Sequence, residues 1–250
     1  MSRWASGEAA IVVALPWEAT PLAIHLGLQR SEVLDGVSRY RGREGRLLLI
    51  QAGMGSEGVA RALTALDKPS LLLSAGFCGG LSPAAHLGEI VIGSQVVGQT
   101  GSFSADPHLL ESASRAFKAL GCPFHVGPIL TVDKVITSAD RMQRPVAPEI
   151  VAVDMESAHL AEAAERQGIP FLAIRAVSDT PSTPWATEER HLLKPDGRLK
   201  TAALAISLFR HPSRIARLLR LASTLRPASR RLARGIEALL KEVGVMETTA

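Results

Sequence analysis

The stretch SLLLSAGFCGGL, residues 70–81, does most to decide the fold. Its first half is a short apolar run of the kind that forms a buried strand. Gly76, Gly79 and Gly80 follow at once, so the pattern predicts a strand over 70–75 that ends in a glycine-rich turn. Glycines let a ligand approach the backbone closely, and in α/β sheets ligands bind beyond the carboxyl ends of the strands. The turn is therefore a candidate binding segment.

Apolar runs of the same kind alternate with helical patterns along the first 180 residues. Few of these runs show the strict alternation of a half-exposed sheet, so the sequence predicts an α/β fold with helices on both faces of the sheet. Pro212 and Pro227 suit helix starts or breaks and mark the C-terminal part as an addition. The expected strands, besides 70–75, are 9–15, 36–42, 46–52, 88–97, 126–136, 150–155 and 171–177, and the expected helices are 18–28, 53–66, 107–120, 157–167, 198–209, 212–225 and 227–243.

The composition is that of a globular protein without a membrane span. The chain has 250 residues, of which 46% are hydrophobic and 21% charged, and this balance excludes disorder as its main state. No apolar run reaches the roughly 18 residues of a transmembrane helix, and the first residues lack the pattern of a signal peptide. Cys78 and Cys122 are too few for a disulfide framework and have no metal-ligand spacing. We therefore expect a cytoplasmic protein without a bound metal.

Charge is divided unevenly along the chain. Residues 1–196 hold 17 Lys and Arg against 21 Asp and Glu, whereas residues 197–236 hold 10 Lys and Arg and no acid. Within 210–235, arginines flank an apolar stripe with helical spacing. Two interpretations stay open, namely a helix that contacts an anionic membrane surface and a helix that packs on the acidic body or on a partner subunit. We do not expect nucleic acid as a partner, because no aromatic side chains alternate with these arginines to stack on bases.

Carboxylates stand at the ends of three expected strands. Glu18 follows the first strand, Asp154 and Glu156 come at the end of the 150–155 strand, and Asp179 follows the last strand. Two or more carboxylates in one crevice suit acid–base cleavage of a sugar bond. Glu18 and Glu156 are equally ordinary in the first turn of a helix, and Asp179 is an ordinary cap. The pattern alone therefore leaves both structural and catalytic roles open.

Six short motifs occur in an order that resembles the purine nucleoside phosphorylase and nucleosidase superfamily. The resemblance spans about residues 10–182 and is nearest to the methylthioadenosine/S-adenosylhomocysteine nucleosidases. The basic tail is similar to that of hopanoid-associated enzymes, which remove adenine from an adenosylated triterpenoid lipid. The resemblance implies a three-layer α/β/α fold with a central mixed twisted sheet over 1–209, followed by a basic amphipathic helical extension over 210–250. The motifs are the first strand with Glu18, QAGMG (51–55), SAGFCGGL (74–81), GEIVIG (88–93), VDMES (153–157) and RAVSDT (175–180).

The resemblance also implies roles for individual residues. Asp179 matches the acid that protonates purine N7, Glu156 matches the carboxylate that binds the ribose hydroxyls, and Glu18 matches the carboxylate that orients the attacking water. Met155 would pack beneath the sugar, and Ser178 would lie beside Asp179. No metal or organic cofactor is implied. The other residues expected at the substrate, where a turn lines the pocket or backbone groups face the base, are Gly76, Phe77, Cys78, Gly79, Val135 and Ile136.

The expected activity is cleavage of the N-ribosidic bond of an adenine nucleoside, with a 5′-modified adenosine such as adenosylhopane as substrate. Hydrolysis is favoured over phosphorolysis, because the phosphorylases of this superfamily bind phosphate through arginines that are missing here. Ser74 stands at one of those positions, and the 15–20 segment contains no arginine either. A phosphate-dependent phosphorylase and a non-catalytic nucleoside- or lipid-binding protein stay as alternatives. The resemblance also implies a homodimer.

Overall fold

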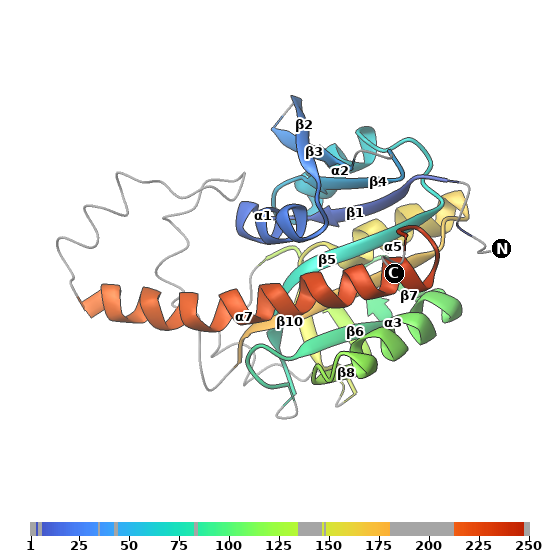
Figure 1. The fold of residues 1–250 in the computed structure, drawn as a ribbon. Coiled ribbons are helices and arrows are strands. Elements are labelled where there is room, and N and C mark those ends of the chain that lie inside the picture. Colours follow the sequence, from blue (N-terminus) through green and yellow to red (C-terminus); the bar gives the residue numbers. More distant parts are fainter. Residues whose placement is uncertain are drawn as a thin grey trace.

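Strands and helices alternate along the chain in the computed structural model, as the sequence predicts (Figure 1). The residues that it describes are 4, 7–34, 36–42, 45–82, 85–134, 147, 149–180 and 213–247, the side chains of 34 and 213–224 excepted. The strands are β1 (Ala9–Val13), β2 (Gln29–Leu34), β3 (Val37–Arg41), β4 (Leu47–Gln51), β5 (Leu71–Gly80), β6 (Ile90–Val97), β7 (Ser102–Ser104), β8 (Phe124–Thr131), β9 (Ala152–Asp154) and β10 (Phe171–Asp179). The helices are α1 (Pro16–His25), α2 (Gly55–Thr64), α3 (Pro107–Ala119), α5 (Ser157–Gln167) and α7 (Ser213–Glu242).

All ten strands belong to one mixed sheet. Their order is β10-β6-β8-β9-β5-β1-β4-β3-β2, with β7 paired to β6. β5 also pairs with β10, so that β5, β10, β6, β8 and β9 close into a ring from which the other strands extend. β1, β4, β5 and β10 are parallel neighbours, and their carboxyl ends therefore meet at one edge.

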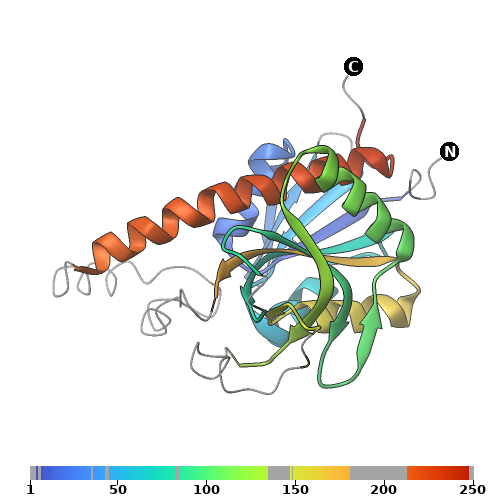
Figure 2. The ribbon, with the colours of Figure 1, turned by 90° about the horizontal axis from the view of Figure 1, so that it is seen from below.

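Helices cover both faces of this sheet and confirm the predicted three-layer architecture (Figure 2). On one face, side chains of α1, α3 and α7 pack against alternate residues of the central strands, such as Ile11, Leu73 and Ile174. On the other face, α2 and α5 pack against the intervening residues, such as Val12 and Leu72. Because alternate side chains of a strand point to opposite faces, strands covered on both faces read as continuous apolar runs.

The predicted glycine-rich turn after residue 75 is wrong, because β5 continues as a strand to Gly80. Gly79 and Gly80 pair with β9 on one side, and Gly79 pairs with Asp179 of β10 on the other. The glycines thus form part of a strand that has neighbouring strands on both sides, where little room is left for side chains. Gly80 illustrates the crowding, since an added Cβ there would lie 3.1 Å from Cβ of Ala85.

The predicted break between two helices at Pro227 is also wrong, because α7 is a single helix from Ser213 to Glu242. Proline removes one backbone hydrogen bond. The apolar side chains that follow it are buried at helical spacing, including Ala228, Leu232 and Ile236, and this packing holds the helix on the body. The expected helix at 198–209 lies outside the described residues.

Two further differences concern the limits of strands. The hairpin strand β2 was not predicted, since its sequence QRSEVL is polar and its described side chains are largely exposed. β8 begins at Phe124 and ends at Thr131, earlier than the expected 126–136. Within the described residues, no helix combines the length and the apolar character that crossing a membrane requires.

Candidate active site

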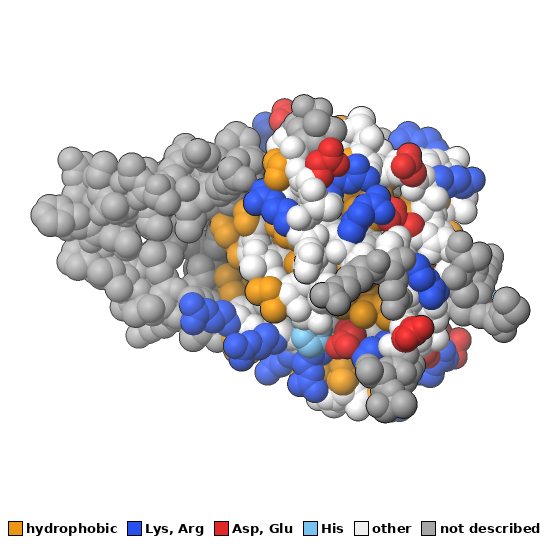
Figure 3. Space-filling model, turned by 45° about the horizontal axis from the view of Figure 1, so that its top comes forward, with side chains coloured by type: hydrophobic (Ala, Val, Ile, Leu, Met, Phe, Trp, Pro, Cys, Tyr) orange, Lys and Arg blue, Asp and Glu red, His pale blue; other side chains and the backbone are white. Residues whose placement is uncertain are grey.

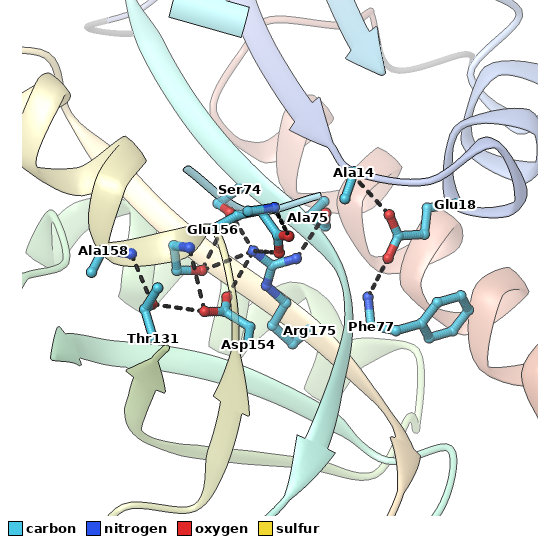
Figure 4. A network of polar contacts seen from close by, with 12 residues as sticks. Ala14, Glu18, Ser74, Ala75, Phe77, Thr131, Asp154, Glu156, Ala158 and Arg175 are labelled. Carbon is cyan, nitrogen blue, oxygen red and sulfur yellow. Dashed lines mark hydrogen bonds and ion pairs between the residues drawn. The ribbon is translucent and has the colours of Figure 1, made fainter. Parts of the chain in front are cut away.

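Glu18 lies at the start of α1, with its carboxylate directed back to the end of β1 and across to β5 (Figure 4). Oε2 accepts hydrogen bonds from the backbone N–H groups of Ala14 (3.0 Å) and Leu15 (2.7 Å), and Oε1 accepts one from Phe77 N (2.8 Å). An acidic residue in the first turn suits the unpaired N–H groups of a helix N-terminus. The contact with β5 adds a third donor, and the residue is only 3% exposed.

Burial raises the pKa of Glu18 from 4.5 to about 7. Removal from water is the largest cause, because it disfavours the charged form. The positive charge of Arg175 acts in the opposite direction, and the negative charge of Glu156 raises the pKa further. A carboxyl that gains and loses its proton near neutral pH has the acidity that a general base requires.

Gly76 is the point on β5 where two polar groups approach the backbone most closely. A Cβ at this position would lie 2.6 Å from Oε1 of Glu18 and 2.7 Å from Nη1 of Arg175. Its φ of +147° is also a conformation that residues with side chains rarely adopt. The glycine therefore lets Glu18 and Arg175 meet over the same stretch of strand.

Arg175 lies in the middle of β10 and is the hub of the polar network in Figure 4. Its side chain is 1% exposed and pairs with Oδ2 of Asp154 at 2.8 Å and with Oε2 of Glu156 at 3.8 Å, both from Nη2. Nη2 also donates to the hydroxyls of Ser74 (2.7 Å) and Ser157 (2.9 Å). A buried guanidinium requires such partners, because an unpaired charge in the interior is costly.

Glu156 lies just before α5 and faces the start of α2. Its Oε1 accepts a hydrogen bond from Gly55 N at 2.9 Å. Burial raises its pKa, with Arg175 opposing the rise and Asp154 adding to it. The preceding residue, Met155, places its Cε 3.7 Å from the point where Gly55 would carry a Cβ. Glu156 and Met155 are thus held against the same glycine segment.

Asp179 lies at the end of β10, beyond an irregularity in the strand between Val177 and Asp179. Asp179 is 6% exposed, and its Oδ1 lies 2.7 Å from the Ser178 hydroxyl. The same hydroxyl lies 3.0 Å from the carbonyl oxygen of Cys78. Ser178 therefore ties Asp179 to β5.

The structure places the predicted site residues in two neighbouring groups along β5 and β10. Glu18, Glu156 and Gly76 lie around Arg175, with Phe77 hydrogen-bonded to Glu18 and Met155 next to Glu156. Asp179, Ser178, Cys78 and Gly79 form the second group, at the ends of the two strands. Val135 and Ile136 lie outside the described residues.

The hub of the network is not among the residues that the sequence predicts for the site. Arg175 stands inside the motif RAVSDT without a predicted role, and Asp154, in VDMES, is predicted only as one of the carboxylates at the strand ends. The signal that identifies Arg175 is its place in the otherwise apolar run FLAIRAV, where a charge is tolerated only with buried partners. Ser74 and Ser157 carry no such signal. Within the described residues, no cluster of side chains has the composition of a metal site.

A groove of about 880 Å³ runs between α1 and α7 and reaches Phe77, the residue that donates to Glu18. Figure 3 shows basic side chains gathered beside apolar ones along the edge of one face of the molecule. Ile24, on α1, is 76% exposed in this groove. The apolar lining includes Pro16, Trp17, Pro21, Ile24, Phe77 and Leu225, and the basic lining consists of Arg226, Arg230 and Arg234, one helical turn apart.

Comparison with known proteins extends this picture. The 5′-methylthioadenosine/S-adenosylhomocysteine nucleosidase of Geobacillus thermodenitrificans is 29% identical over 197 residues, which make up 69% of this chain and 84% of that protein. The corresponding nucleosidase of Neisseria meningitidis, solved in complex with methylthio-immucillin-A, shares the fold with a TM-score of 0.69 and 21% identity over 94% of this chain and 98% of that one. Futalosine hydrolase of Helicobacter pylori does so with a TM-score of 0.72 and 16% identity over 94% and 97%.

A family model described as the phosphorylase superfamily matches residues 8–210, which include every strand described above. The sequence motifs, the fold and the relatives agree with this match. The chain therefore belongs to the phosphorylase superfamily, and it is an enzyme.

Proposed function

We propose that this enzyme hydrolyses the N-ribosidic bond of a 5′-modified adenine nucleoside. The observation that supports the proposal most is the arrangement of Glu18 and Glu156 around Arg175 (Figure 4). Asp179 lies further along the same strand as the arginine. Breaking a bond between ribose and a purine leaves positive charge on the sugar and negative charge on the base. Carboxyls that differ in environment can meet both needs.

Each carboxyl takes a separate part of the reaction. Glu156, as a carboxylate, binds the ribose hydroxyls and stabilises the positive charge that develops on the sugar. Asp179 donates a proton to N7 as the electron pair of the C1′–N9 bond moves onto the adenine. Glu18 accepts a proton from the water whose oxygen forms the new bond to C1′. The products are adenine and the free sugar, and proton exchange with solvent then removes the proton from Glu18 and returns one to Asp179.

Water suits this site better than phosphate as the nucleophile. Arg175 is committed to carboxylates and hydroxyls, and Glu18 lies where the charge of a phosphate would be repelled. Arg226, Arg230 and Arg234 lie in the groove that reaches Phe77, and in a phosphorylase they would be candidates for binding phosphate.

Substitution of the carboxyls tests the proposal. With 5′-methylthioadenosine as substrate, Glu156→Gln and Asp179→Asn should each lower the rate of adenine release by about 10²–10⁴-fold, the usual share of one acid–base or electrostatic group. Glu165→Gln, which removes an exposed carboxylate of α5, is the matched control and should leave the rate unchanged. Wild-type rates in both catalytic variants would contradict the assignment.

We further propose that the 5′ substituent is large and apolar, as in adenosylhopane, and occupies the groove between α1 and α7. Support comes from the aromatic and aliphatic lining of the groove and from its continuity with Phe77 beside Glu18. Ile24→Gln would make the lining more polar at a point away from the carboxyls. This variant should lower kcat/KM several-fold for an adenosine with a long 5′-alkyl chain and leave 5′-methylthioadenosine hydrolysis unchanged. An equal effect on both substrates would show that the 5′-alkyl chain of the substrate does not occupy this groove.

A further inference from the structure

Asp154 belongs to the polar network but has no part in the reaction described above. Its side chain is fully buried, and its Oδ2 lies 2.8 Å from Nη2 of Arg175. Of the reacting groups, Glu156 approaches the same Nη2 from a greater distance, and Glu18 meets Nη1 over Gly76. One buried cation thus faces three buried carboxyls in the described part of the chain, which would carry a net charge of −2 if all were ionised. How strongly each carboxyl interacts with the arginine therefore affects the pKa values of the others.

A second contact holds Asp154 through Oδ1, the carboxylate oxygen that does not pair with Arg175. Its Oδ1 accepts a hydrogen bond from the Thr131 hydroxyl at 2.7 Å, and β8 and β9 pair these two residues in register. The Thr131 oxygen in turn accepts from Ala158 N at 2.9 Å, in the first turn of α5. Thr131 of β8, itself held by α5, therefore fixes the orientation of this carboxylate.

Asp154 is also the nearest carboxylate to the shared cation. Its oxygen is 2.8 Å from Nη2, whereas that of Glu156 is 3.8 Å away. Because the attraction between charges falls with distance, Asp154 takes the larger share of the positive charge. Its own negative charge raises the pKa of Glu156, and the charge of Glu156 raises that of Glu18. The groups that face Arg175 are Glu18 from α1, Cys78 from β5, Asp154 from β9 and Glu156 from the segment before α5.

We propose that Asp154 is a positioning residue, which anchors Arg175 and takes up most of its charge, so that Glu18 and Glu156 stay basic near neutral pH. This inference rests on the proposed hydrolysis only for its kinetic readout. Without Asp154, the arginine would be shared by the two reacting carboxyls alone, and both would become stronger acids. A stronger acid is a weaker base, so the water would lose part of its activation.

The test is the pH dependence of kcat/KM for Asp154→Asn and Asp154→Glu. The asparagine variant should move the acid limb of the profile to lower pH by roughly one unit and lower the plateau. Asp154→Glu keeps the charge, so its acid limb should stay within a few tenths of a unit of the wild type, whatever happens to the plateau. Glu165→Gln, an exposed control with the same change of charge, should not move the limb. An unmoved or upward-shifted limb in folded Asp154→Asn would overturn the proposal.

Two additions keep the outcome decisive. If Asp154→Asn does not fold by circular dichroism, Thr131→Val replaces it, since loss of the hydroxyl donor loosens Asp154 without removing its charge. A smaller shift of the limb in the same direction is then expected, and no shift would refute the proposal. Titration of the carboxyls by ¹³C NMR in glutamate-labelled, ligand-free protein should show the same displacement of two buried glutamates. That readout separates failure of this inference from failure of the proposed activity.

Discussion

At the scale of the residue, the site contains carboxyls that are buried away from water, although their burial makes ionisation unfavourable. Glu18 is buried among three backbone N–H donors, and its pKa still rises to about 7 because removal from water outweighs those bonds and the charge of Arg175. The structure thus accepts an unfavourable charge where the reaction needs a base. Such a conflict between local stability and chemistry is typical of functional sites.

The raised pKa of Glu18 makes a prediction about stability. Between pH 4.5 and about 7 the folded protein keeps a proton that the unfolded chain has released, so the free energy of unfolding falls as pH rises through this window. One group with this shift accounts for a fall of about 3 kcal/mol. Glu18→Gln removes the titration. Urea unfolding should therefore show the free energy of unfolding of the variant, relative to the wild type, rising by about 2.5 kcal/mol from pH 5 to pH 8, which covers most of this window.

Glu165→Gln is the control for this experiment, because the carboxylate it removes is exposed, and its difference from the wild type should not change with pH in the same way. Parallel pH dependences for the wild type and Glu18→Gln would mean that Glu18 titrates equally in the folded and unfolded states. The account of its acidity given above would then fail.

At the scale of the element, β5 and β10 explain both the success and the failure of sequence reasoning. Apolar runs identified both strands, and the motifs at their ends pointed to Asp179 and the glycines. The sequence could not show which strands lie side by side, or which charged side chains they bring together. Gly79 and Gly80 look like a turn until β9 and β10 are known to flank them, and Arg175 lacks a visible partner until β9 brings Asp154 beside it.

The packing of helix α7 against α3 likewise could not be predicted from the sequence, because the contact joins segments that are distant along the chain. It supports a prediction about stability. Gly235 faces the buried ring of Phe117 on α3, and an added Cβ would lie 2.0 Å from ring atoms. Gly235→Ala should therefore lower the free energy of unfolding by about 1–3 kcal/mol, although alanine favours helices. Phe117→Leu in the same protein should restore part of the loss, as a double-mutant cycle would show. A stabilising Gly235→Ala, or an absence of coupling, would show that α7 packs on α3 differently.

At the scale of the whole molecule, the structure shows where part of the basic C-terminal region lies, namely in helix α7. Of the two interpretations of the basic C-terminal region, packing on the body applies to the second half of α7, where Ala228, Leu232 and Ile236 join the core. Glu237 and Glu242 then pair with His25 of α1 and Arg115 of α3. Arg226, Arg230 and Arg234 instead line the groove beside α1. The division of the chain at 209/210 and a membrane contact stay predictions.

Hydrolysis of an adenine nucleoside requires that the oxygen of the sugar product come from water. The enzyme would be incubated with 5′-methylthioadenosine in ¹⁸O-labelled water, with and without millimolar phosphate, and the products analysed by mass spectrometry. We expect free adenine and a sugar that carries ¹⁸O at C1′, at the same rate in both buffers. Product formation only with phosphate, as a sugar 1-phosphate, would contradict hydrolysis and would direct attention to the arginines of the groove.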